Sequence, residues 1–467
     1  MIPVLTPEEM AGVDRTTEQA VPELVARAGA AVASGALKLM GGAYARRVVV
    51  VAGPGNNGAD GRVAAEILAG MGALVDVRDA RDLRPSEPLP EADLLIDAAY
   101  GTGLRRPYQP PRSSSPVLAV DIPSGLDGLT GEVPDGGGVL AAAATVSFAS
   151  LKPGLLLGAG PELAGELTVA DIGLGAEVGR AASCWLVEDA DVAGHLCQKP
   201  RESHKWQSAV QVVAGSPGMT GAPWLVSRSA MRAGAGYVRL SMPGVSPTVL
   251  PPSEVVHLPV PATGWHGPVL AQISRVKALV VGPGLGPVTG GPEGSGGLPG
   301  GEVGLLLAAA DVPAVVDADG LNAMGGIDGL AAVVARRRHP TVVTPHAGEL
   351  ARLLGRPPGP DKLAVTREAA ARSGAVVLFK GSTTVVAAPD GRALLAATGS
   401  ARLATAGTGD VLSGMVGAFL ARGIAPLEAA ALAAHAHGRA AGSGFAEGLV
   451  AGDLPELVAA WLSGLRA

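Results

Sequence analysis

Short runs of apolar, β-branched residues alternate with alanine-rich segments along the whole chain. Runs that are apolar on both faces are typical of parallel sheets covered by helices, and their alternation with helical segments predicts βαβ units. The first part of the chain is therefore expected to form a mostly parallel α/β sheet. Its runs are RRVVVV (46–51), LVDV (74–77), DLLID (93–97), VLAVDI (117–122), TVSF (145–148) and LTVADI (167–172).

A second series of the same kind predicts a second α/β domain. Between the two series, residues 182–206 have weaker periodicity and several polar residues, so we divide the chain into domains 1–183 and 184–467. The glycine-rich stretch PVTGGPEGSGGLPGG (287–301) is expected to be a flexible surface loop. The runs of the second series are AVQVVAG (209–215), ALVVGPG (278–284), PAVVDADG (313–320), TVVTP (341–345), AVVLFKG (375–381) and TTVVAA (383–388).

Composition narrows the class of protein. A chain of 467 residues is too long for one ordinary core, and 48% hydrophobic with 17% charged residues argues against disorder. A net charge of −6 without a basic run makes nucleic acid a poor partner. Cys184 and Cys197 show no CxxC spacing, which fits a reducing compartment. Neither a signal peptide nor a membrane-spanning run is seen, so a soluble cytoplasmic protein is expected.

The stretch VVVVAGPGNNGADGRVAAEIL (48–68) reads as a strand, a glycine-rich turn and a helix. Such a turn directs backbone N–H groups and the positive end of a helix toward phosphate. Glycine strings of this kind are common, and asparagines tolerate left-handed turn geometry, so Asn56 and Asn57 taken alone leave an ordinary turn equally open.

Polar residues at two further strand ends point to a ligand site in the first domain. Asp97 ends one strand before a Gly-Thr-Gly turn, and Asp121 ends the next strand, with Ser124 close behind. Ligands of open α/β sheets gather at the carboxyl ends of strands, so Asn57, Asp97 and Ser124 can converge. Their oxygen atoms suit a hard cation such as potassium or magnesium, and Asp121 is the natural general acid or base. Helix capping is the competing explanation for each aspartate.

AGPGNNGADG, the Asp97–Leu104 stretch and DIPSGLDG together resemble the N-terminal domain of NAD(P)H-hydrate epimerases. The resemblance implies a Rossmann-like three-layer domain in which Asn57, Asp97 and Ser124 hold potassium. The chain has Ala59 where the family usually has glycine, and a Cβ there restricts the backbone angles of the turn. The implied substrate-binding residues are Asn56, Asn57, Gly58, Ala59, Asp60, Gly101, Thr102, Gly103, Leu104 and Asp121.

The second domain carries its own set of polar strand ends. TPHAGEL (344–350) places His346 and Glu349 just after a strand, although a histidine with satisfied hydrogen bonds in a turn is the more frequent case. FKGSTTVV (379–386) places Lys380 at a strand end, followed by Gly381, Ser382, Thr383 and Thr384. Lysine, glycine and hydroxyls in this order suit a nucleotide phosphate, but an ordinary solvated lysine is an alternative. His435 and His437, two apart on a predicted helix, point to different faces and are interpreted as structural.

TAGTGDVLSGM (405–415) raises a question of charge, because it places Asp410 beside a glycine turn suited to an anion. A carboxylate there repels a bound phosphate, so its role would be to take a proton from an incoming hydroxyl. The turn and the helix N-terminus would stabilise the charge that develops on the phosphoryl oxygens. A helix cap is the competing role for Asp410.

GSPGMTGA, VGPGLG, DADGLN, TPHAGE, KGSTT and AGTGD occur in that order and together resemble the ADP-dependent NAD(P)H-hydrate dehydratases, which have a ribokinase-like α/β fold. HKWQSA differs from the family's usual start by Trp206 in place of glycine. The resemblance implies a fused epimerase and dehydratase, commonly a homo-oligomer. The implied substrate contacts are Ala222, Gly286, His346 and Asp410, and the implied ADP contacts are Lys380, Gly381, Ser382, Thr383, Thr384 and Gly409.

The implied reaction is the repair of hydrated NADH or NADPH. Asp410 would activate the hydroxyl at C6 of the reduced nicotinamide ring, and ADP, with Mg²⁺, would phosphorylate it. Elimination would leave NAD(P)H, AMP and phosphate. The dehydratase accepts the S epimer, and the first domain would convert R to S, with Asp121 and Asp410 as the catalytic residues.

Two other functions stay open at this stage. One is a ribokinase-like small-molecule kinase with a nucleotide-binding accessory domain, which would phosphorylate an alcohol without dehydrating it. The other is a nucleotide sensor with degenerate sites, against which the two carboxylates Asp121 and Asp410 argue, because a binder has little use for a base beside phosphate.

Overall fold

The computed structural model describes residues 1–104, 106–196, 200–251, 253–286 and 298–465. The chain divides into two compact units, Ile2–Cys184 and Trp185–Ala467, the latter together with Met1. They are called the first unit and the second unit below. Residues 287–297 of the expected glycine-rich surface loop, and Cys197, lie outside the described residues.

The first unit contains a six-stranded sheet in which all neighbouring strands run parallel, as predicted. The strand order is β3-β2-β4-β5-β6-β7, so the chain reverses its direction across the sheet between β2 and β4. Ligands of open α/β sheets bind at such a point, outside the carboxyl ends of the strands. The strands are β2 (Arg47–Ala52), β3 (Leu74–Asp79), β4 (Leu94–Ala98), β5 (Val117–Val120), β6 (Ala144–Phe148) and β7 (Glu166–Ala170), with a short β1 (Ile2–Val4) before them.

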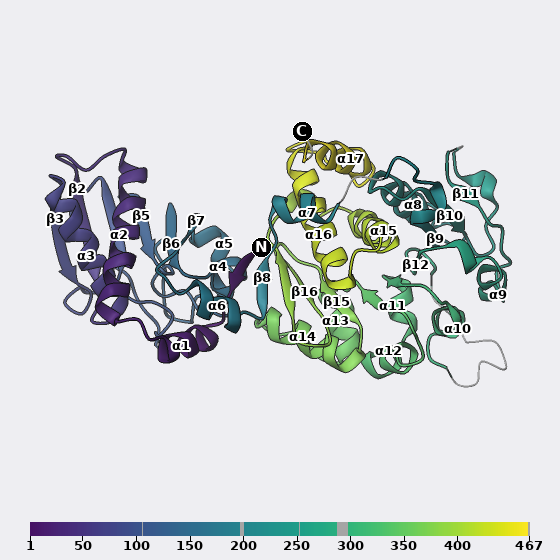
Figure 1. Ribbon diagram of the computed structural model, residues 1–467, viewed down its shortest axis with the longest axis horizontal. Helices are drawn as coiled ribbons and strands as arrows, with labels where there is room; N and C mark the ends of the chain where they lie inside the picture. Colours follow the sequence, from purple (N-terminus) through teal and green to yellow (C-terminus); the bar gives the residue numbers. More distant parts are fainter. Residues whose placement is uncertain (105, 197–199, 252, 287–297, 466–467) are drawn as a thin grey trace. The chain divides into compact units, whose positions relative to one another are not determined.

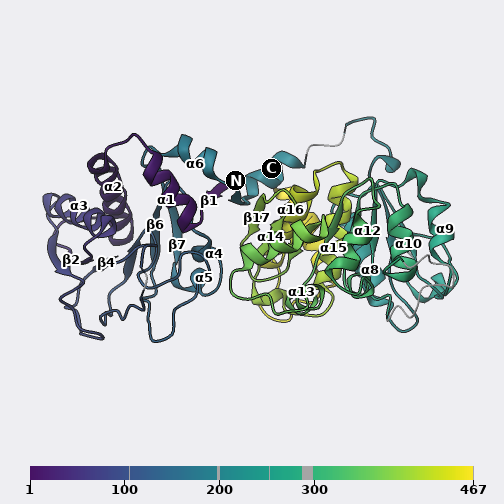
Figure 2. The same cartoon turned by 90° about the horizontal axis from the view of Figure 1, so that it is seen from below.

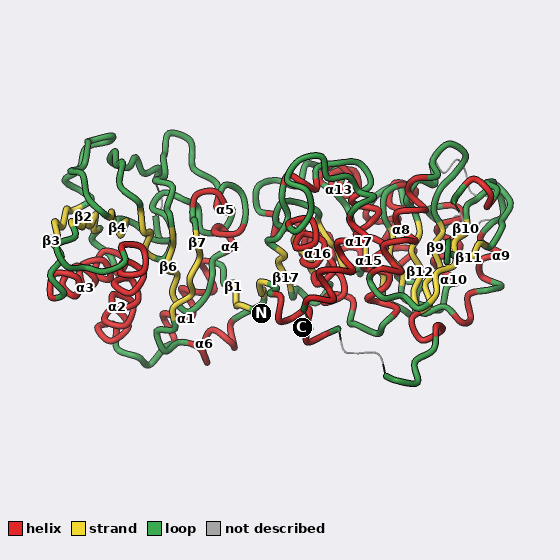
Figure 3. The backbone as a smooth tube through the Cα atoms, turned by 90° about the horizontal axis from the view of Figure 1, so that it is seen from above, coloured by secondary structure: helices red, strands yellow, loops and turns green. Residues whose placement is uncertain are grey.

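Helices cover one face of this sheet, and loops cover the other (Figure 3). The apolar stripe of each helix packs on alternate strand residues such as Val48, Val50 and Ile96, whereas Val49, Val51 and Leu95 face the loops. The helices on the covered face are α1 (Pro7–Thr16), α2 (Val21–Met40), α3 (Asn56–Gly70) and α6 (Gly175–Ala181). Two short helices, α4 (Pro153–Leu156) and α5 (Gly160–Leu163), lie between β6 and β7 in the chain.

The second unit has a larger sheet with the strand order β8-β17-β16-β15-β14-β13-β12-β9-β10-β11. The strands from β15 through β14, β13, β12, β9 and β10 to β11 are parallel neighbours, while β16 pairs antiparallel with β15 and β17. The strands are β8 (Cys184–Leu186), β9 (Ala209–Val213), β10 (Tyr237–Ser241), β11 (Val256–His257), β12 (Ala278–Val281), β13 (Ala314–Val316), β14 (Thr341–Val343), β15 (Val376–Phe379), β16 (Thr384–Ala387) and β17 (Ala393–Ala396).

Helices lie on both faces of this sheet (Figures 1 and 2). One face carries α7 (Asp189–His195), α8 (Gly221–Arg232), α15 (Thr408–Ala421), α16 (Pro426–Gly442) and α17 (Leu454–Gly464). The other carries α10 (Gly301–Ala309), α11 (Asp319–Ala323), α12 (Ile327–Val334), α13 (Ala347–Leu354) and α14 (Lys362–Ser373). The remaining helices are α9 (His266–Leu270) and the 3₁₀ turns η1 (Lys205–Ser208), η2 (Pro247–Val249), η3 (Ile273–Arg275) and η4 (Ala401–Leu403).

α15 is the central helix of its layer and approaches α8 very closely. A Cβ at Gly414 would lie 2.1 Å from Ser229 Oγ and 2.2 Å from the Val226 carbonyl oxygen of α8. A glycine is therefore required for this contact. The contact fixes the position of α15, which begins at Thr408 and carries Asp410 in its first turn.

No helix in the described part of the chain combines the length and the apolar character that crossing a membrane requires.

Candidate active sites

In the first unit, the glycine turn after β2 leads directly into α3. A Cβ at Gly58 would lie 1.9 Å from the Gly53 carbonyl oxygen, so this close turn requires glycine. The residues from Asn56 to Asp60 form the first turn of the helix. The Ala59 N–H donates to the Gly55 carbonyl at 3.1 Å and its φ is negative, so the methyl group of Ala59 does not strain this turn.

The polar residues at the ends of β4 and β5 bind one another. The Asp97 carboxylate accepts hydrogen bonds from Ser124 Oγ at 2.6 Å and from the Ser124 N–H at 2.9 Å. Ser124 Oγ in turn accepts from the Tyr100 N–H at 2.9 Å. Asp97 is 3% exposed, and this burial raises its pKa in spite of the hydrogen bonds. Hydrogen bonds to the buried Asp97 carboxylate and to Ser124 thus connect the loop after β4 with the loop after β5.

Asn57 and Asp121 meet at the Gly-Thr-Gly turn. The Cβ position of Gly101 is 3.7 Å from Asn57 Oδ1 and 3.7 Å from Asp121 Oδ2, so both side chains line this turn. The Asn57 amide nitrogen is buried and lacks a hydrogen-bond partner within the described residues. Asp121 has a φ of 66°, in the left-handed region that is uncommon for a residue with a side chain and that recurs at functional sites.

A buried lysine that was not predicted from the sequence as a site residue completes this group. Lys152 is 2% exposed, and its ammonium donates to Asp121 Oδ1 and, at 3.1 Å, to Ser147 Oγ. The only signal in the sequence is a lysine four residues after an apolar strand in a chain that otherwise prefers arginine.

Asp60 has a very different environment from Asp121. Its side chain is 6% exposed and makes no hydrogen bond among the described residues. Burial, and then the negative charge of Asp121, raise the pKa of Asp60 to about 8. Asp60 therefore carries a proton at neutral pH, and this makes it a potential donor beside the carboxylate of Asp121.

In the second unit, the first turn of α15 lies against Lys380. Gly407 begins the helix with a φ of 91°, so Asp410 is not its cap. A Cβ at Gly407 would lie 2.5 Å from Leu225 Cδ1, and one at Gly409 would lie 3.3 Å from Lys380 Nζ. The two glycines thus leave the amide groups of the turn and the ammonium of Lys380 next to one another, which suits a phosphate.

Lys380 is held in place by carboxylates from neighbouring strand ends. Its Nζ is 3.0 Å from Asp317 Oδ1 and 3.8 Å from Glu349 Oε2. Burial alone would lower the pKa of Lys380, but these two carboxylates outweigh it and raise that pKa, so the ammonium stays charged. Asp317 also accepts a 2.6 Å hydrogen bond from Ser413, three residues after Asp410 on α15. Neither Asp317 nor Ser413 was predicted from the sequence as a site residue.

The Asp410 carboxyl group has the properties of a general base. It forms no hydrogen bond within the described part of the chain. Burial, followed by the charge of Asp317, raises its pKa to about 7, although Lys380 acts in the opposite direction. A general base is most effective when its pKa is close to the working pH.

The substrate contacts expected in this unit lie around the same strand ends. His346 caps α13, and its Nδ1 accepts from the Gly348 N–H at 3.0 Å, as expected for a turn histidine, while the ring stays exposed. The Gly286 N–H donates to Asp319 Oδ2 at 2.9 Å. Ala222, at the start of α8, lies against the turn at Gly284, where a Cβ would be 3.0 Å from its own.

The segment from Lys380 to Thr384 has an exposed half and a buried half. Gly381 and Ser382 are exposed, whereas Thr383 and Thr384 are 3% and 8% exposed at the start of β16. A ligand can therefore reach Lys380, Gly381 and Ser382 directly, whereas the two threonines are buried beneath the surface of the turn.

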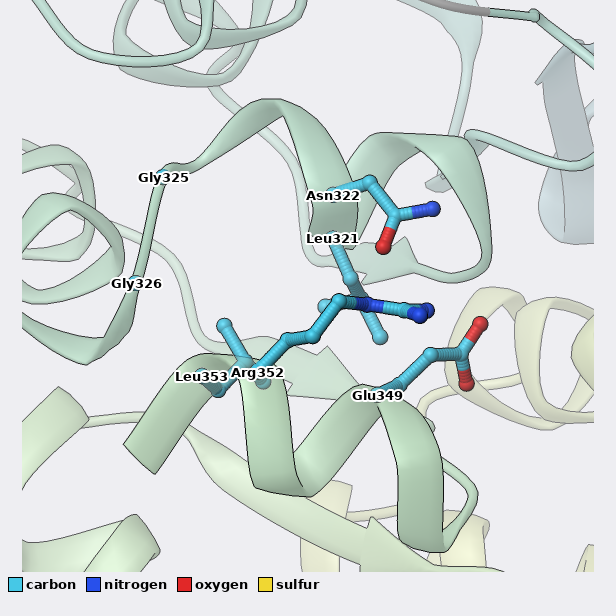
Figure 4. Close-up of a pocket in the computed structure, with 7 residues that line it drawn as sticks. All are labelled: Leu321, Asn322, Gly325, Gly326, Glu349, Arg352 and Leu353. Atoms are coloured by element: carbon cyan, nitrogen blue, oxygen red, sulfur yellow. The ribbon is translucent and has the colours of Figure 1, made fainter. Parts of the chain in front are cut away.

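A cavity of about 440 Å³ adjoins this centre through Glu349 (Figure 4). Figure 4 shows the Arg352 guanidinium between the Asn322 amide and the Glu349 carboxylate. A guanidinium and an amide beside an open cavity suit a phosphate or carboxylate of a ligand. The lining residues are Leu321, Asn322, Gly325, Gly326, Glu349, Arg352 and Leu353.

His437 is buried and interacts electrostatically with Lys380. It is 5% exposed, and burial, followed by the charge of Lys380, lowers its pKa to about 4. The ring is therefore neutral at physiological pH. Its neighbour in the motif, His435, binds Asp189 Oδ1 through Nε2 at 2.7 Å, so the two histidines have different partners.

Two family models match the chain. Residues 210–462 match the model described as NAD(P)H-hydrate dehydratase, and residues 21–87 and 78–154 match the model described as YjeF-related protein N-terminus. The first match alone spans more than half of the chain.

Curated relatives match both units together. The bifunctional NAD(P)H-hydrate repair enzyme Nnr of Mycobacterium tuberculosis is 37% identical over 425 residues, which cover 84% of this chain and 82% of the relative. The protein of the same name from Moorella thermoacetica is 34% identical over 502 residues, covering 94% and 91%. Among solved structures, the ADP/ATP-dependent NAD(P)H-hydrate dehydratase of Bacillus subtilis, co-crystallised with ATP and Mg²⁺, is 28% identical with a TM-score of 0.51. It covers 60% of this chain and 97% of the solved one.

Proposed function

The chain belongs to the family of bifunctional NAD(P)H-hydrate repair enzymes, and from this premise we propose that each of its two units performs one of the two reactions. The first domain predicted from the sequence, residues 1–183, epimerises the R and S forms of hydrated NAD(P)H. The second predicted domain, residues 184–467, dehydrates the S form with ADP. The observation that carries the proposal is the carboxyl group of Asp410, with a pKa of about 7, in a helix turn that also lies against Lys380.

In the dehydratase reaction, Asp410 is the general base. It takes the proton of the C6 hydroxyl, and the hydroxyl oxygen then attacks the terminal phosphorus of ADP, so that AMP leaves. The Gly409 turn and Lys380 stabilise the charge on the phosphoryl oxygens. Phosphate then leaves C6 together with a proton from the adjacent ring carbon, and the double bond of NAD(P)H forms. His346, Gly286 and Ala222 line the side on which the ring would bind.

The nucleotide contacts would come from the turn after β15. Lys380, Gly381 and Ser382 are the accessible members of that turn, and Thr383 and Thr384 hold it in shape. Mg²⁺ would accompany the nucleotide, since it binds phosphate oxygens in preference to all-protein cages. The relative from Bacillus subtilis, whose structure was determined with ATP and Mg²⁺, supports this part of the proposal.

In the epimerase reaction, C6 bears both a hydroxyl group and the ring nitrogen, so opening of the C6–N1 bond interconverts the epimers. Asp121 Oδ2 takes the hydroxyl proton while the bond electrons pass to N1, which becomes protonated, and C6 becomes an aldehyde. Ring closure on the opposite face reverses these transfers. Asp60, protonated below about pH 8, supplies the proton to N1 on ring opening and takes it back on ring closure, while Asp121 returns its proton to the re-formed hydroxyl.

Potassium is the cation that the first unit would hold, through Asn57, Asp97 and Ser124. The test of this fit is Asp97, a buried carboxylate whose hydrogen bonds come from neutral donors and which has no cationic partner within the described residues. A monovalent cation beside it would compensate the buried charge and order the loops around the substrate. Across the described residues, no three His, Cys, Asp or Glu side chains cluster as a transition-metal site would require.

Single substitutions separate the two reactions. Asp410→Asn should lower ADP-dependent dehydration of the S epimer at least about a hundredfold, because the base is lost, while epimerisation continues. Asp121→Asn should stop epimerisation and leave dehydration of the S epimer intact. The assays are chromatographic separation of the epimers and recovery of NADH absorbance. Near-normal dehydration by Asp410→Asn, or a phosphorylated product that is released without dehydration, would count against the proposal.

A further inference from the structure

Lys152 occupies a position that is unusual for a lysine. Its ammonium lies near the end of β6 with the side chain 2% exposed, and four oxygen atoms lie within hydrogen-bond distance of its three N–H donors. These are Asp121 Oδ1, Ser147 Oγ at 3.1 Å, and the carbonyls of Phe148 and Ser150 at 3.4 Å each. Lysines are almost never fully buried unless they are paired with an acidic group. The ion pair with Asp121 therefore accounts for the burial of Lys152.

The Asp121 carboxylate is bound on one side only. Oδ1 accepts from Lys152 and, at 3.3 Å, from Ser147 Oγ. Oδ2 accepts no hydrogen bond within the described residues, and it lies 3.7 Å from the Cβ position of Gly101. One oxygen is thus held by the protein, and the other is presented to the turn at which the substrate is proposed to bind.

We propose that Lys152 is the positioning residue of the epimerase: together with Ser147 it fixes Asp121 Oδ1 and compensates the charge, so that Oδ2 faces the substrate hydroxyl. This inference rests on the proposed function of the first unit. Lys152 itself does not touch the substrate, because the peptide carbonyls and Asp121 surround its ammonium.

Stability alone does not account for this arrangement. A buried ion pair contributes little net stability compared with apolar side chains of the same volume. The pair uses Asp121 Oδ1, whereas Oδ2 accepts no hydrogen bond within the described residues and lines the Gly101 turn together with Asn57. Two further carboxyl groups, Asp14 and Asp60, interact electrostatically with Asp121, and Lys152 is the cation buried among these acids.

The test compares two lysines of the first unit in the full chain. Lys152→Met keeps the side-chain length and removes the charge, and Lys38→Met removes an exposed lysine that pairs with Glu166. We expect Lys152→Met to lower kcat for epimerisation at least about a hundredfold while KM changes less than about threefold, because a free Asp121 carboxylate no longer keeps its orientation. Lys38→Met should behave like the wild-type chain. Dehydration of the S epimer should stay unchanged in both variants.

Two further variants keep the inference testable if Lys152→Met folds poorly. Ser147→Ala removes the hydroxyl that accepts from Lys152 and lies within hydrogen-bond distance of Asp121 Oδ1 and the Ser150 carbonyl, but it keeps the ion pair. It should lower kcat by about three- to tenfold in a protein that is still folded at the assay temperature. Lys152→Ala should regain epimerase activity when methylammonium is added, and should not respond to methanol, because the missing element is a cation.

Three results would overturn the inference. These are a wild-type kcat in folded Lys152→Met, a rise in KM alone, and equal rescue of Lys152→Ala by methanol and methylammonium. If instead wild-type protein and Lys38→Met both fail to interconvert the epimers, the epimerase function itself is wrong. The two failures are therefore distinguishable.

Discussion

Each of the two candidate centres contains a lysine that follows a strand and lies against a carboxylate. Lys152 pairs with Asp121, and Lys380 pairs with Asp317. Arginine is far commoner than lysine in this chain, yet both of these positions carry lysine. A compact ammonium can donate to several oxygen atoms from one point, whereas a planar guanidinium needs room for its fork. The choice of residue type thus agrees with a confined cation that is paired with a carboxylate at each centre.

The pKa of Asp410 leads to a prediction for the pH dependence of dehydration. Because this pKa is raised to about 7, Asp410 is largely protonated below pH 7 and cannot accept the hydroxyl proton. The kcat/KM for the S epimer, which reports groups of the free enzyme, should therefore rise as the pH increases through 7 and level off above it. Initial rates between pH 5.5 and about 9 would measure this. A profile that is flat through pH 7 would contradict the assignment of the base.

Asp60 predicts a pH dependence of the opposite sign for epimerisation. Its pKa of about 8 means that it loses its proton, and with it the ability to donate, as the pH rises through 8. The kcat/KM for epimerisation should therefore fall above pH 8. Asp60→Asn should lower this activity roughly tenfold to hundredfold, and its residual activity should lack the decline. A decline that persists in Asp60→Asn would assign it to another group.

At the scale of elements, the strands in the buried parts of both sheets are predictable, because their runs are apolar on both faces. β10 and β17 were missed for two different reasons. Arg239 interrupts the apolar run of β10, and only the fold supplies its buried partner, Gln211 of β9, at 2.6 Å. Residues 393–396, ALLA, have helical propensity, and pairing with β16 overrides it.

The candidate sites were predictable to the extent that they lie at strand ends within recognisable motifs. Lys152 and Ser147 were not, because they follow Asp121 by 31 and 26 positions and only the parallel pairing of β5 with β6 brings them together. Asp317 and Ser413 were missed for the same reason. They are 96 positions apart in the chain and meet only because α15 packs beside the carboxyl end of β13.

The contact of α15 with α8 predicts a coupling between packing and catalysis. In Gly414→Ala the new methyl group would overlap the Val226 carbonyl, so α15 must move and displace Asp410 at its first turn. We expect a loss of stability of about 1–3 kcal/mol, typical of overpacking, and a lower kcat for dehydration. Calorimetry and rates for each epimer would measure both effects.

Gly442→Ala is the matched control for this substitution. Gly442 ends α16 with open space around its Cβ position, so the change should preserve both stability and activity. Gly414→Ala should leave epimerisation unchanged, because the first unit has a core of its own. An active and equally stable Gly414→Ala would contradict the proposed coupling.

At the scale of the whole molecule, the two reactions require each other. A dehydratase that accepts one epimer leaves the other unrepaired, and an epimerase alone restores no NAD(P)H. A single chain with both centres converts the whole mixture. The two units have separate hydrophobic cores, so each centre can be inactivated without removing the other.

Potassium provides a selective test of the first unit within the intact chain. Replacement of potassium by tetramethylammonium, which is too large for a site formed by Asn57, Asp97 and Ser124, should lower the rate of epimerisation. Dehydration of the S epimer should be unaffected, because Lys380 already supplies the cation of the second centre. Equal rates of epimerisation in the two salts would show that the first unit does not need potassium for activity.

The most direct test of bifunctional repair is the recovery of NADH absorbance from a mixture of both epimers of hydrated NADH, with ADP, Mg²⁺ and K⁺. The wild-type chain should restore the whole mixture, faster than the epimers interconvert spontaneously, and only when ADP is present. Asp121→Asn should stop at the S fraction, and Asp410→Asn should restore almost nothing. No ADP-dependent recovery by the wild-type chain would contradict the central claim, and recovery that stops at the S fraction would contradict its epimerase half.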